Sequence, residues 1–187
     1  MDIYLFQECP DVRRVRNGLG FSGMADHQFG HGLAVAWNNN RFTMIGQGMQ
    51  LVAMDRPGFS FEAERFVGWV RLQERSTRKV FFVANHHGPL DINTGGRTGS
   101  ETVASNIHNA INRNKGSGDI VILAGDINAD AASRTIRSLQ SKGYRRRASD
   151  WVDHILTKDG LNSSSQVSII HGAGSDHRGV SVRWSSS

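Results

Sequence analysis

Three polar residues follow one another at the end of an apolar run in the segment Ile120–Ala132, IVILAGDINADAA. The first four residues are branched and apolar, which is typical of a strand buried on both faces. After Gly125 come Asp126, Asn128 and Asp130. Carboxylate and carboxamide oxygens at the end of a rigid strand are suitable ligands for a hard cation such as Mg²⁺. The segment therefore predicts a polar site that could hold such a cation.

This segment has two simpler interpretations. A calcium loop of the EF-hand type is excluded, because its sixth position is Ala131 and its twelfth is Arg137, where Gly and Glu are required. Helix capping is the second interpretation: Asp130 is expected to cap a helix over Ala131–Lys142 that ends at Gly143. Capping accounts for this aspartate and leaves the two preceding polar residues unexplained.

Polar residues also follow two other predicted strands. Ile3–Phe6 is followed by Glu8, and Lys79–Ala84 is followed by His86 and His87. Because side chains alternate along a strand, only one of the two histidines is expected to face a site at this end. The pattern favours His87 slightly and leaves the choice open.

The other predicted elements are those that must position these residues. A hairpin is expected between two of the strands, Gly32–Trp37 and Phe42–Met54, and a glycine-rich loop with His27 and His31 is expected over Gly18–Gly32. The remaining predicted strands are Val67–Leu72, Trp151–Leu156 and Val180–Trp184, and the remaining predicted helices are a short one within Asp11–Gly18 and an amphipathic one from a capping box at Thr98 to Asn114.

Length and composition set broad limits. The chain has 187 residues, enough for a single domain over residues 1–187. No apolar run approaches the roughly 20 residues that a membrane span needs, and the single cysteine, Cys9, excludes an internal disulfide. The net charge is +5, with 18 Arg and 4 Lys. Guanidinium groups suit phosphodiesters, although a genomic bias toward Arg codons explains the excess equally well.

Several of these motifs together resemble a known superfamily. Gly125-Asp126-Ile127-Asn128-Ala129 is similar to the GDFNA signature of the endonuclease/exonuclease/phosphatase superfamily, which includes pancreatic-type deoxyribonucleases, abasic-site endonucleases, sphingomyelinases and inositol-phosphate phosphatases. The other motifs that resemble this family, in its order, are Gln7-Glu8, Glu64-Arg65, the histidine after Asn85, the Asp-x-Ile segment at Asp153, and Ser175-Asp176-His177 before the last strand. A first strand with an Asn motif is missing from this pattern.

The resemblance implies a fold and a set of site residues. The implied fold is α+β, a four-layer α/β/β/α sandwich with two packed mixed β-sheets. For the metal, the resemblance implies Glu8 as the principal Mg²⁺ ligand, with Asp176 in support and with Mn²⁺ or Ca²⁺ as alternative ions. Asp126 is expected to orient or deprotonate the attacking water, and Asn128 to fix that water and the phosphate. Two acid/base histidines are also implied: His177, held by Asp153, and either His86 or His87, held by Glu64.

The expected activity is metal-dependent hydrolysis of phosphodiester bonds, with DNA as the substrate of a monomeric endonuclease. The alternatives are a lipid or inositol-phosphate phosphodiesterase, which would share the same core motifs, and a catalytically weak nucleic-acid-binding module. Arg145, Arg146 and Arg147 form the densest positive cluster. They are expected to be a solvated surface, with contact to a nucleic acid backbone as the alternative. The sequence does not indicate a cellular compartment.

Overall fold

A computed structural model describes residues 2–18, 20, 22–55, 64–90, 99–161, 165–171 and 175–184. Thr98 of the predicted capping box lies outside these residues. The strands are β1 (Ile3–Phe6), β2 (Met24–Gly30), β3 (Leu33–Asn38), β4 (Phe42–Met54), β5 (Glu64–Glu74), β6 (Val80–His86), β7 (Ile120–Asp126), β8 (Arg145–Asp150), β9 (Asp153–Lys158), β10 (Ser165–Ile170) and β11 (Gly179–Trp184). The helices are α1 (Val12–Gly18), α2 (Gly99–Asn114) and α3 (Arg134–Ser141). None of the described helices is long and apolar enough to cross a membrane.

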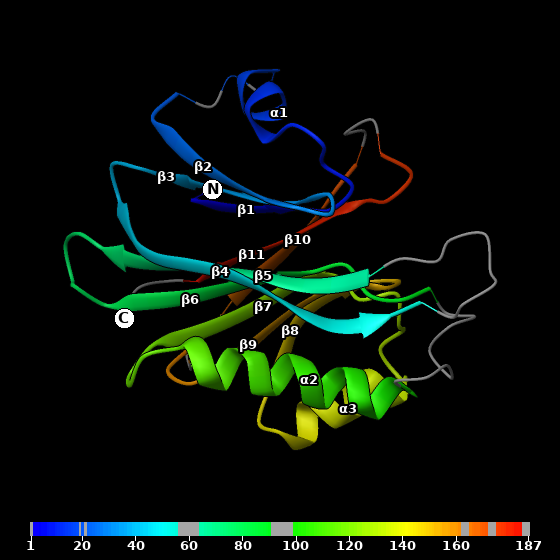
Figure 1. Ribbon diagram of the computed structural model, residues 1–187. Coiled ribbons are helices and arrows are strands. Elements are labelled where there is room, and N and C mark those ends of the chain that lie inside the picture. Colours follow the sequence, from blue (N-terminus) through cyan, green and yellow to red (C-terminus); the bar gives the residue numbers. More distant parts are fainter. Residues whose placement is uncertain are drawn as a thin grey trace.

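The elements form four layers, with α2 and α3 on one outer side and α1 on the other (Figure 1). One inner layer is a six-stranded mixed sheet in the order β4-β5-β6-β7-β9-β8, in which β6 and β7 run parallel and the other neighbours run antiparallel. The predicted α+β sandwich is confirmed. In this sheet β7, which carries the central motif, lies between β6 and β9.

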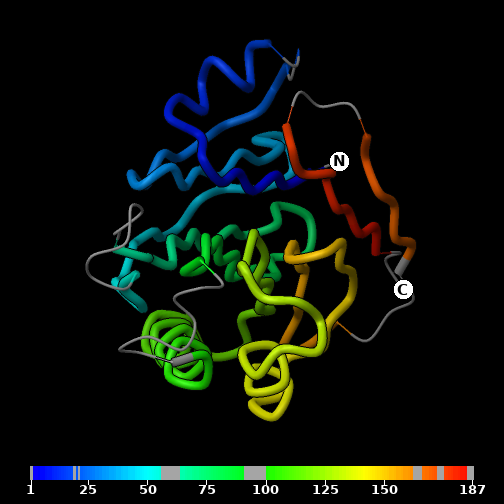
Figure 2. The backbone as a smooth tube through the Cα atoms, turned by 90° about the vertical axis from the view of Figure 1, so that its right-hand side faces the viewer, coloured from blue at the N-terminus to red at the C-terminus, as the bar shows by residue number. Residues whose placement is uncertain are grey.

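The second inner layer differs from the predicted single mixed sheet. Its described strands form two antiparallel sheets, β1-β3-β2 and β10-β11. Figure 2 shows the β10-β11 pair beside the three-stranded sheet, with α1 above the latter. Among the described residues β1 pairs only with β3, and β11 only with β10.

Alternation along the central strands divides the apolar side chains between two cores. On β6, Phe82 and Ala84 pack toward α2 and α3, whereas Val83 packs toward the three-stranded sheet. On the helix side the core includes Val103, Ile107, Ala110 and Ile111, the predicted apolar face of α2, and all four are at most 1% exposed. Burial of both faces explains why β6 and β7 are almost continuously apolar.

Two predicted connections are wrong. The expected hairpin between β3 and β4 does not form, because the strands belong to different sheets and the three asparagines lead the chain from one layer to the other. The expected loop over Gly18–Gly32 contains strand β2, which pairs with β3. Glycine content misled the prediction because β2 is an edge strand, where a full row of apolar side chains is not required.

The predicted helix after the central motif is shorter than expected. It begins at Arg134, and its N-cap is Ser133, whose side chain accepts a hydrogen bond from the Ile136 amide. Asp130 instead closes the preceding turn by accepting from the Ala132 amide at 2.7 Å. Gly143, with φ +92°, ends the helix as predicted, since its amide donates to the Gln140 carbonyl.

Candidate active site

The turn after β7 fixes the side chain of Asp126. The Asn128 amide donates to Asp126 Oδ1 at 2.8 Å, and the Asn128 side chain donates to the Gly88 carbonyl at 2.9 Å. The Gly88 amide in turn donates to the Asp126 carbonyl at 2.8 Å. Asn128 has a φ of +51°, a left-handed conformation that Asn tolerates better than most residues. Asp126 Oδ1 is therefore occupied, which leaves Oδ2 for chemistry.

Two glycines allow the ends of β6 and β7 to approach this closely. A Cβ at Gly125 would lie 2.0 Å from the His86 carbonyl oxygen, and one at Gly88 would lie 2.0 Å from the Ile127 carbonyl oxygen. Gly125 also has a φ of +141°, which disfavours any side chain. Both glycines are thus required for the contacts that hold Asp126 and Asn128.

Asp153 and His177 come together although they lie 24 residues apart in the chain. Asp153 begins β9 directly opposite Asp126, and its Oδ2 accepts from His177 Nδ1 at 2.8 Å. The same imidazole nitrogen lies 3.9 Å from Asp126 Oδ2. Burial opposes protonation of the imidazole, but the hydrogen bond and charge of Asp153, with the charge of Asp126, outweigh it and raise the pKa of His177.

His87, rather than His86, lies at this site. His87 Nε2 is 3.6 Å from Asp126 Oδ2, and its side chain is 15% exposed. Burial, followed by the charge of Arg65, lowers the pKa of His87. His86 is completely buried, and its Nδ1 donates to the Phe66 carbonyl at 2.8 Å. Burial lowers the pKa of His86 to about 4, so this residue is a neutral core histidine.

Glu8 follows β1 and is solvent-exposed. It has a φ of +51°, and Gly32 packs behind it, because a Cβ there would lie 3.1 Å from Glu8 Cα. Its charge contributes to the electrostatic environment of His87. Its carboxylate has no hydrogen bond or ion pair with the part of the chain that the structure describes. A non-glycine residue in this conformation costs free energy, and such costs are commonly found at functional sites.

Asn85 links β1 and β3 to the six-stranded sheet just below Glu8. Its side chain donates to the carbonyls of Phe6 (2.8 Å) and Ala34 (2.9 Å) and accepts from Gln7 Nε2 at 2.5 Å. Asn85 is 1% exposed, so these bonds form in a region shielded from water. The sequence identified Asn85 only as part of the histidine motif and missed this positioning role.

Glu64 does not contact either histidine through any interaction among the described residues. It is exposed at the start of β5. The buried carboxylate near His87 is Asp55, which accepts from Arg65 Nε at 2.8 Å and from the Leu90 amide at 3.1 Å. The sequence prediction does not include Asp55, although it directly follows the apolar end of β4, the same signal that indicates Asp126.

Asp176 is exposed, and its Oδ1 accepts a hydrogen bond from Oγ of the neighbouring Ser175 at 3.5 Å. Gly174 of the same motif lies outside the described residues. Within the described ranges no group of three or more His, Cys, Asp or Glu side chains is arranged to hold a metal ion.

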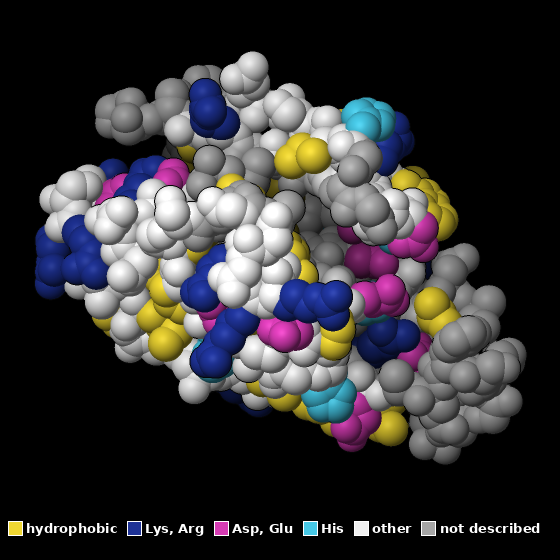
Figure 3. All heavy atoms as spheres, turned by 90° about the horizontal axis from the view of Figure 1, so that it is seen from above, with side chains coloured by type: hydrophobic (Ala, Val, Ile, Leu, Met, Phe, Trp, Pro, Cys, Tyr) yellow, Lys and Arg dark blue, Asp and Glu magenta, His cyan; other side chains and the backbone are white. Residues whose placement is uncertain are grey.

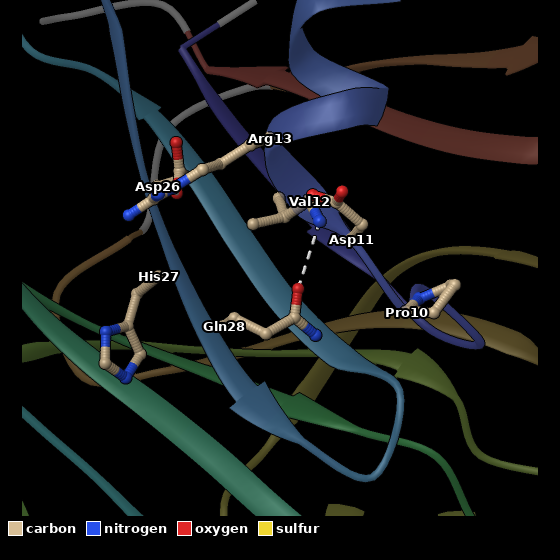
Figure 4. Close-up of a pocket in the computed structure, with 7 residues that line it drawn as sticks. All are labelled: Pro10, Asp11, Val12, Arg13, Asp26, His27 and Gln28. Atoms are coloured by element: carbon tan, nitrogen blue, oxygen red, sulfur yellow. Dashed lines mark hydrogen bonds and ion pairs between the residues drawn. The ribbon is translucent and has the colours of Figure 1, made fainter.

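A separate hollow lies between α1 and β2 and is lined by Asp11, Arg13, Asp26, His27 and Gln28, with Pro10 and Val12 (Figure 4). Its polar groups are engaged with one another. Gln28 accepts from the Val12 amide and donates to the Cys9 carbonyl, and Asp26 is paired with Arg16 at 2.5 Å. These contacts hold α1 on the sheet, and they place the hollow apart from the residues around Asp126.

The chain is similar in fold to several solved structures. A mannosyl-6-phosphatase from Bacteroides thetaiotaomicron aligns with a TM-score of 0.69 and 17% identity over 89% of this chain and 73% of that one. The human Nocturnin catalytic domain with bound sulfate aligns with a TM-score of 0.63 and 17% identity over 89% of this chain and 71% of that one. A humanized TDP2 from D. rerio aligns with a TM-score of 0.64 and 12% identity over 96% of this chain and 82% of that one.

A sequence comparison with curated proteins gave no match. The sequence does match the Endonuclease/Exonuclease/phosphatase family over residues 2–177, which includes all the motifs described above except the last strand. The chain therefore belongs to the Endonuclease/Exonuclease/phosphatase family of hydrolytic phosphoesterases.

Proposed function

We propose that this protein is a divalent-metal-dependent phosphodiesterase that acts as an endonuclease on DNA. The observation that carries the proposal is the surroundings of Asp126 Oδ2, which lies 3.6 Å from His87 Nε2 and 3.9 Å from His177 Nδ1. One carboxylate between two imidazoles supplies both a proton acceptor and proton donors within one small volume.

Asp126 acts as the proton acceptor. Its Oδ2 orients and deprotonates the water that attacks phosphorus, while Asn128 holds Oδ1 in place. The new phosphorus–oxygen bond forms as the bond to the leaving oxygen breaks, and that oxygen must take up a proton. His177 is suited to donate it, because Asp153 raises its pKa and occupies Nδ1, so that Nε2 is the nitrogen available to the substrate.

His87 has a different electrostatic environment. Burial and the charge of Arg65 lower its pKa, so it is more readily neutral than His177. A neutral imidazole can still donate one hydrogen bond to a phosphate oxygen. We assign His87 to phosphate binding and His177 to proton donation, because His177 Nδ1 is held by the Asp153 carboxylate at 2.8 Å, whereas His87 Nε2 lies 3.6 Å from Asp126 Oδ2; the opposite pKa shifts of the two histidines agree with this division.

The donor set fits a hard cation. Mg²⁺ keeps several waters and takes one or two carboxylates together with substrate phosphates, so it does not need a cluster of three protein ligands. Glu8 offers a carboxylate that is exposed and not used elsewhere in the described structure, and Asp176 would support the same cation. A bound cation would neutralise charge that develops on the phosphate.

The charge of the protein favours a polyanionic substrate. The net charge is +5, and Lys and Arg side chains are spread over the face seen in Figure 3, whereas several acidic side chains gather toward one end of it. Spread positive charge attracts a long phosphate backbone from many directions. This is the support for DNA over a small neutral headgroup.

The test is nicking of supercoiled plasmid with Mg²⁺ or Mn²⁺, and its arrest by EDTA. Sphingomyelin, an inositol polyphosphate and a sugar phosphate are assayed in parallel. Asp126→Asn and His177→Ala should each lower the nicking rate at least about a hundredfold. The matched controls Asp159→Asn and His108→Ala lie away from the site and should nick at the wild-type rate. Turnover of a lipid or sugar phosphate without nicking would refute the DNA assignment.

The metal role of Glu8 has its own measurement. Glu8→Gln should raise the Mg²⁺ concentration that gives half-maximal rate by about tenfold or more, because a neutral amide is a weaker ligand than a carboxylate. Glu101→Gln, another exposed glutamate, serves as the control. An unchanged Mg²⁺ dependence in Glu8→Gln would remove Glu8 from the metal site.

A further inference from the structure

Trp151 is the most exposed of the large hydrophobic side chains identified among the described residues. Its exposed fraction is 71%, against 45% for the next, Ile45. Among the other tryptophans, Trp37 is 4% exposed and Trp69 packs against the core. Large apolar side chains left open to water are often found at binding surfaces. The exposed side chain of Trp151 lies next to the candidate site.

The indole of Trp151 lies beside His177. The two ring centroids are 5.3 Å apart with an interplanar angle of 47°. His177 Nδ1 is bonded to Asp153, so a phosphate that contacts Nε2 lies within reach of the indole. The neighbouring Val152 accepts a hydrogen bond from the Ile127 amide at 3.0 Å. This bond ties the turn that carries the indole to the segment that carries Asp126.

The turn itself does not favour tryptophan. Trp151 and Val152 form a two-residue connection between the paired residues Asp150 and Asp153, and Trp151 has a φ of +50°. Asn or Gly is preferred at left-handed positions of such turns. A bulky residue there destabilises the fold, and because the indole is exposed, little burial energy offsets this cost. A tryptophan that strains its turn, gains little from burial and borders His177 is better explained by binding than by folding stability.

We propose that Trp151 stacks on a nucleobase next to the scissile phosphate, and that the substrate is therefore unpaired at this point. This inference rests on the proposed phosphodiesterase function. Aromatic side chains bind single-stranded nucleic acids by stacking, with little sequence preference, because every base has a π-face. In a duplex both faces of a base are already stacked, so an exposed indole finds no partner there without base opening.

The experiment uses a single-stranded DNA oligonucleotide in which one phosphodiester is unmodified and the other linkages are phosphorothioates. A second oligonucleotide carries abasic residues on both sides of that phosphodiester, and a third is the first annealed to its complement. Wild-type protein is compared with Trp151→Asn and Trp151→Phe. Ile45→Asn, a change at an exposed apolar residue on β4, is the control.

Wild-type protein should lose about 5- to 150-fold in kcat/KM when the flanking bases are removed, the range that corresponds to one stacked base. Trp151→Asn should show this loss already on the normal oligonucleotide, mostly as a higher KM, and no further loss on the abasic one. Trp151→Phe should retain most of the activity. Trp151→Asn should also raise the Tm by about 2–4 °C, because Asn suits the left-handed turn.

The inference would be overturned if wild-type protein cleaved the normal and the abasic oligonucleotide equally well. It would also be overturned if removal of the flanking bases lowered the kcat/KM of Trp151→Asn by as large a factor as that of wild-type protein. If wild-type protein cleaves neither, the proposed phosphodiesterase function fails instead. Stacking is then read from indole fluorescence in EDTA, titrated with the same oligonucleotides. Quenching that disappears in Trp151→Phe, and with the abasic strand, would support stacking, and its absence in wild-type protein would refute it.

Discussion

The pairing of Asp153 with His177 gives the most decisive test of the proposed chemistry. The variants are Asp153→Asn, His177→Ala and the double variant. If the carboxylate acts only by orienting and charging the imidazole, the two residues work as one unit. Each single variant should then lose at least about a hundredfold in rate, and the double variant should lose little more than the worse single one.

The structure sets the expected effect on stability. The pair makes one hydrogen bond of 2.8 Å between side chains that are 16% and 26% exposed, and it buries little apolar area. Losing a partly exposed bond of this kind costs about 1 kcal/mol, or roughly 2–4 °C in Tm for a protein of this size. A hundredfold loss in rate corresponds to about 2.7 kcal/mol. The rate should therefore fall by much more than folding stability does.

The measurements are nicking rates at 25 °C and thermal melting of each variant. Asp150→Asn is the matched control, because Arg178 Nη2 donates to Asp150 Oδ1 at 2.6 Å and joins the same two segments of the chain, one residue from His177 and three residues from Asp153. It should lower the Tm about as much as Asp153→Asn and leave the rate nearly unchanged. Rate losses that multiply in the double variant would refute the paired mechanism. A large fall in Tm, with activity lost only as the protein unfolds, would make the pair a structural bond.

Three further predictions concern the residues that support the site. His86→Gln should make the Tm fall less steeply as the pH drops from 6.5 to 4. In wild-type protein the folded-state pKa of His86, about 4, lies below its ordinary value, so protonation opposes folding in this pH range. The same dependence of Tm on pH in the variant and in wild-type protein would contradict this. Gly88→Ala should lower the free energy of unfolding by about 1–3 kcal/mol and reduce activity, since its Cβ would lie 2.0 Å from a carbonyl oxygen, whereas Gly18→Ala, with open space around it, should be tolerated in denaturant unfolding. Asn85→Ala should lower the Tm and also raise the Mg²⁺ concentration needed for activity, because two buried carbonyls lose their donor and Glu8 loses its support. A lower Tm with an unchanged Mg²⁺ titration would show that Asn85 joins the two sheets without positioning Glu8.

Part of the site was predictable because its signals are local. The apolar run of β7, the glycine that ends it and the polar residues that follow are neighbours in the chain, so Asp126 and Asn128 could be identified without a structure. The apolar face of α2 was identified for the same reason, since burial at helical spacing leaves a periodic pattern. The order of the motifs along the chain then indicated the family fold.

The choices that failed or stayed open depend on contacts between distant segments. Alternation shows that His86 and His87 face opposite ways, but only the packing of β5 and the position of β7 decide that His86 is buried and His87 borders Asp126. Asp55, and not Glu64, is the buried carboxylate near His87, because it is held just after β4 by Arg65 of β5 and by the Leu90 amide, which follows β6. Neither fact leaves a periodic signal in the sequence.

The sequence by itself determined which side chains are available for chemistry and on which strand ends they sit, because hydrophobic periodicity and turn residues act over a few neighbouring positions. Only the tertiary structure decided how Asp126, His87 and the Asp153–His177 pair meet, and that Trp151 is left open beside them. The physical reason is that burial, electrostatic environment and exposure are properties of the surroundings. Those surroundings are assembled from strands that are distant in the chain and adjacent only in the folded sheets.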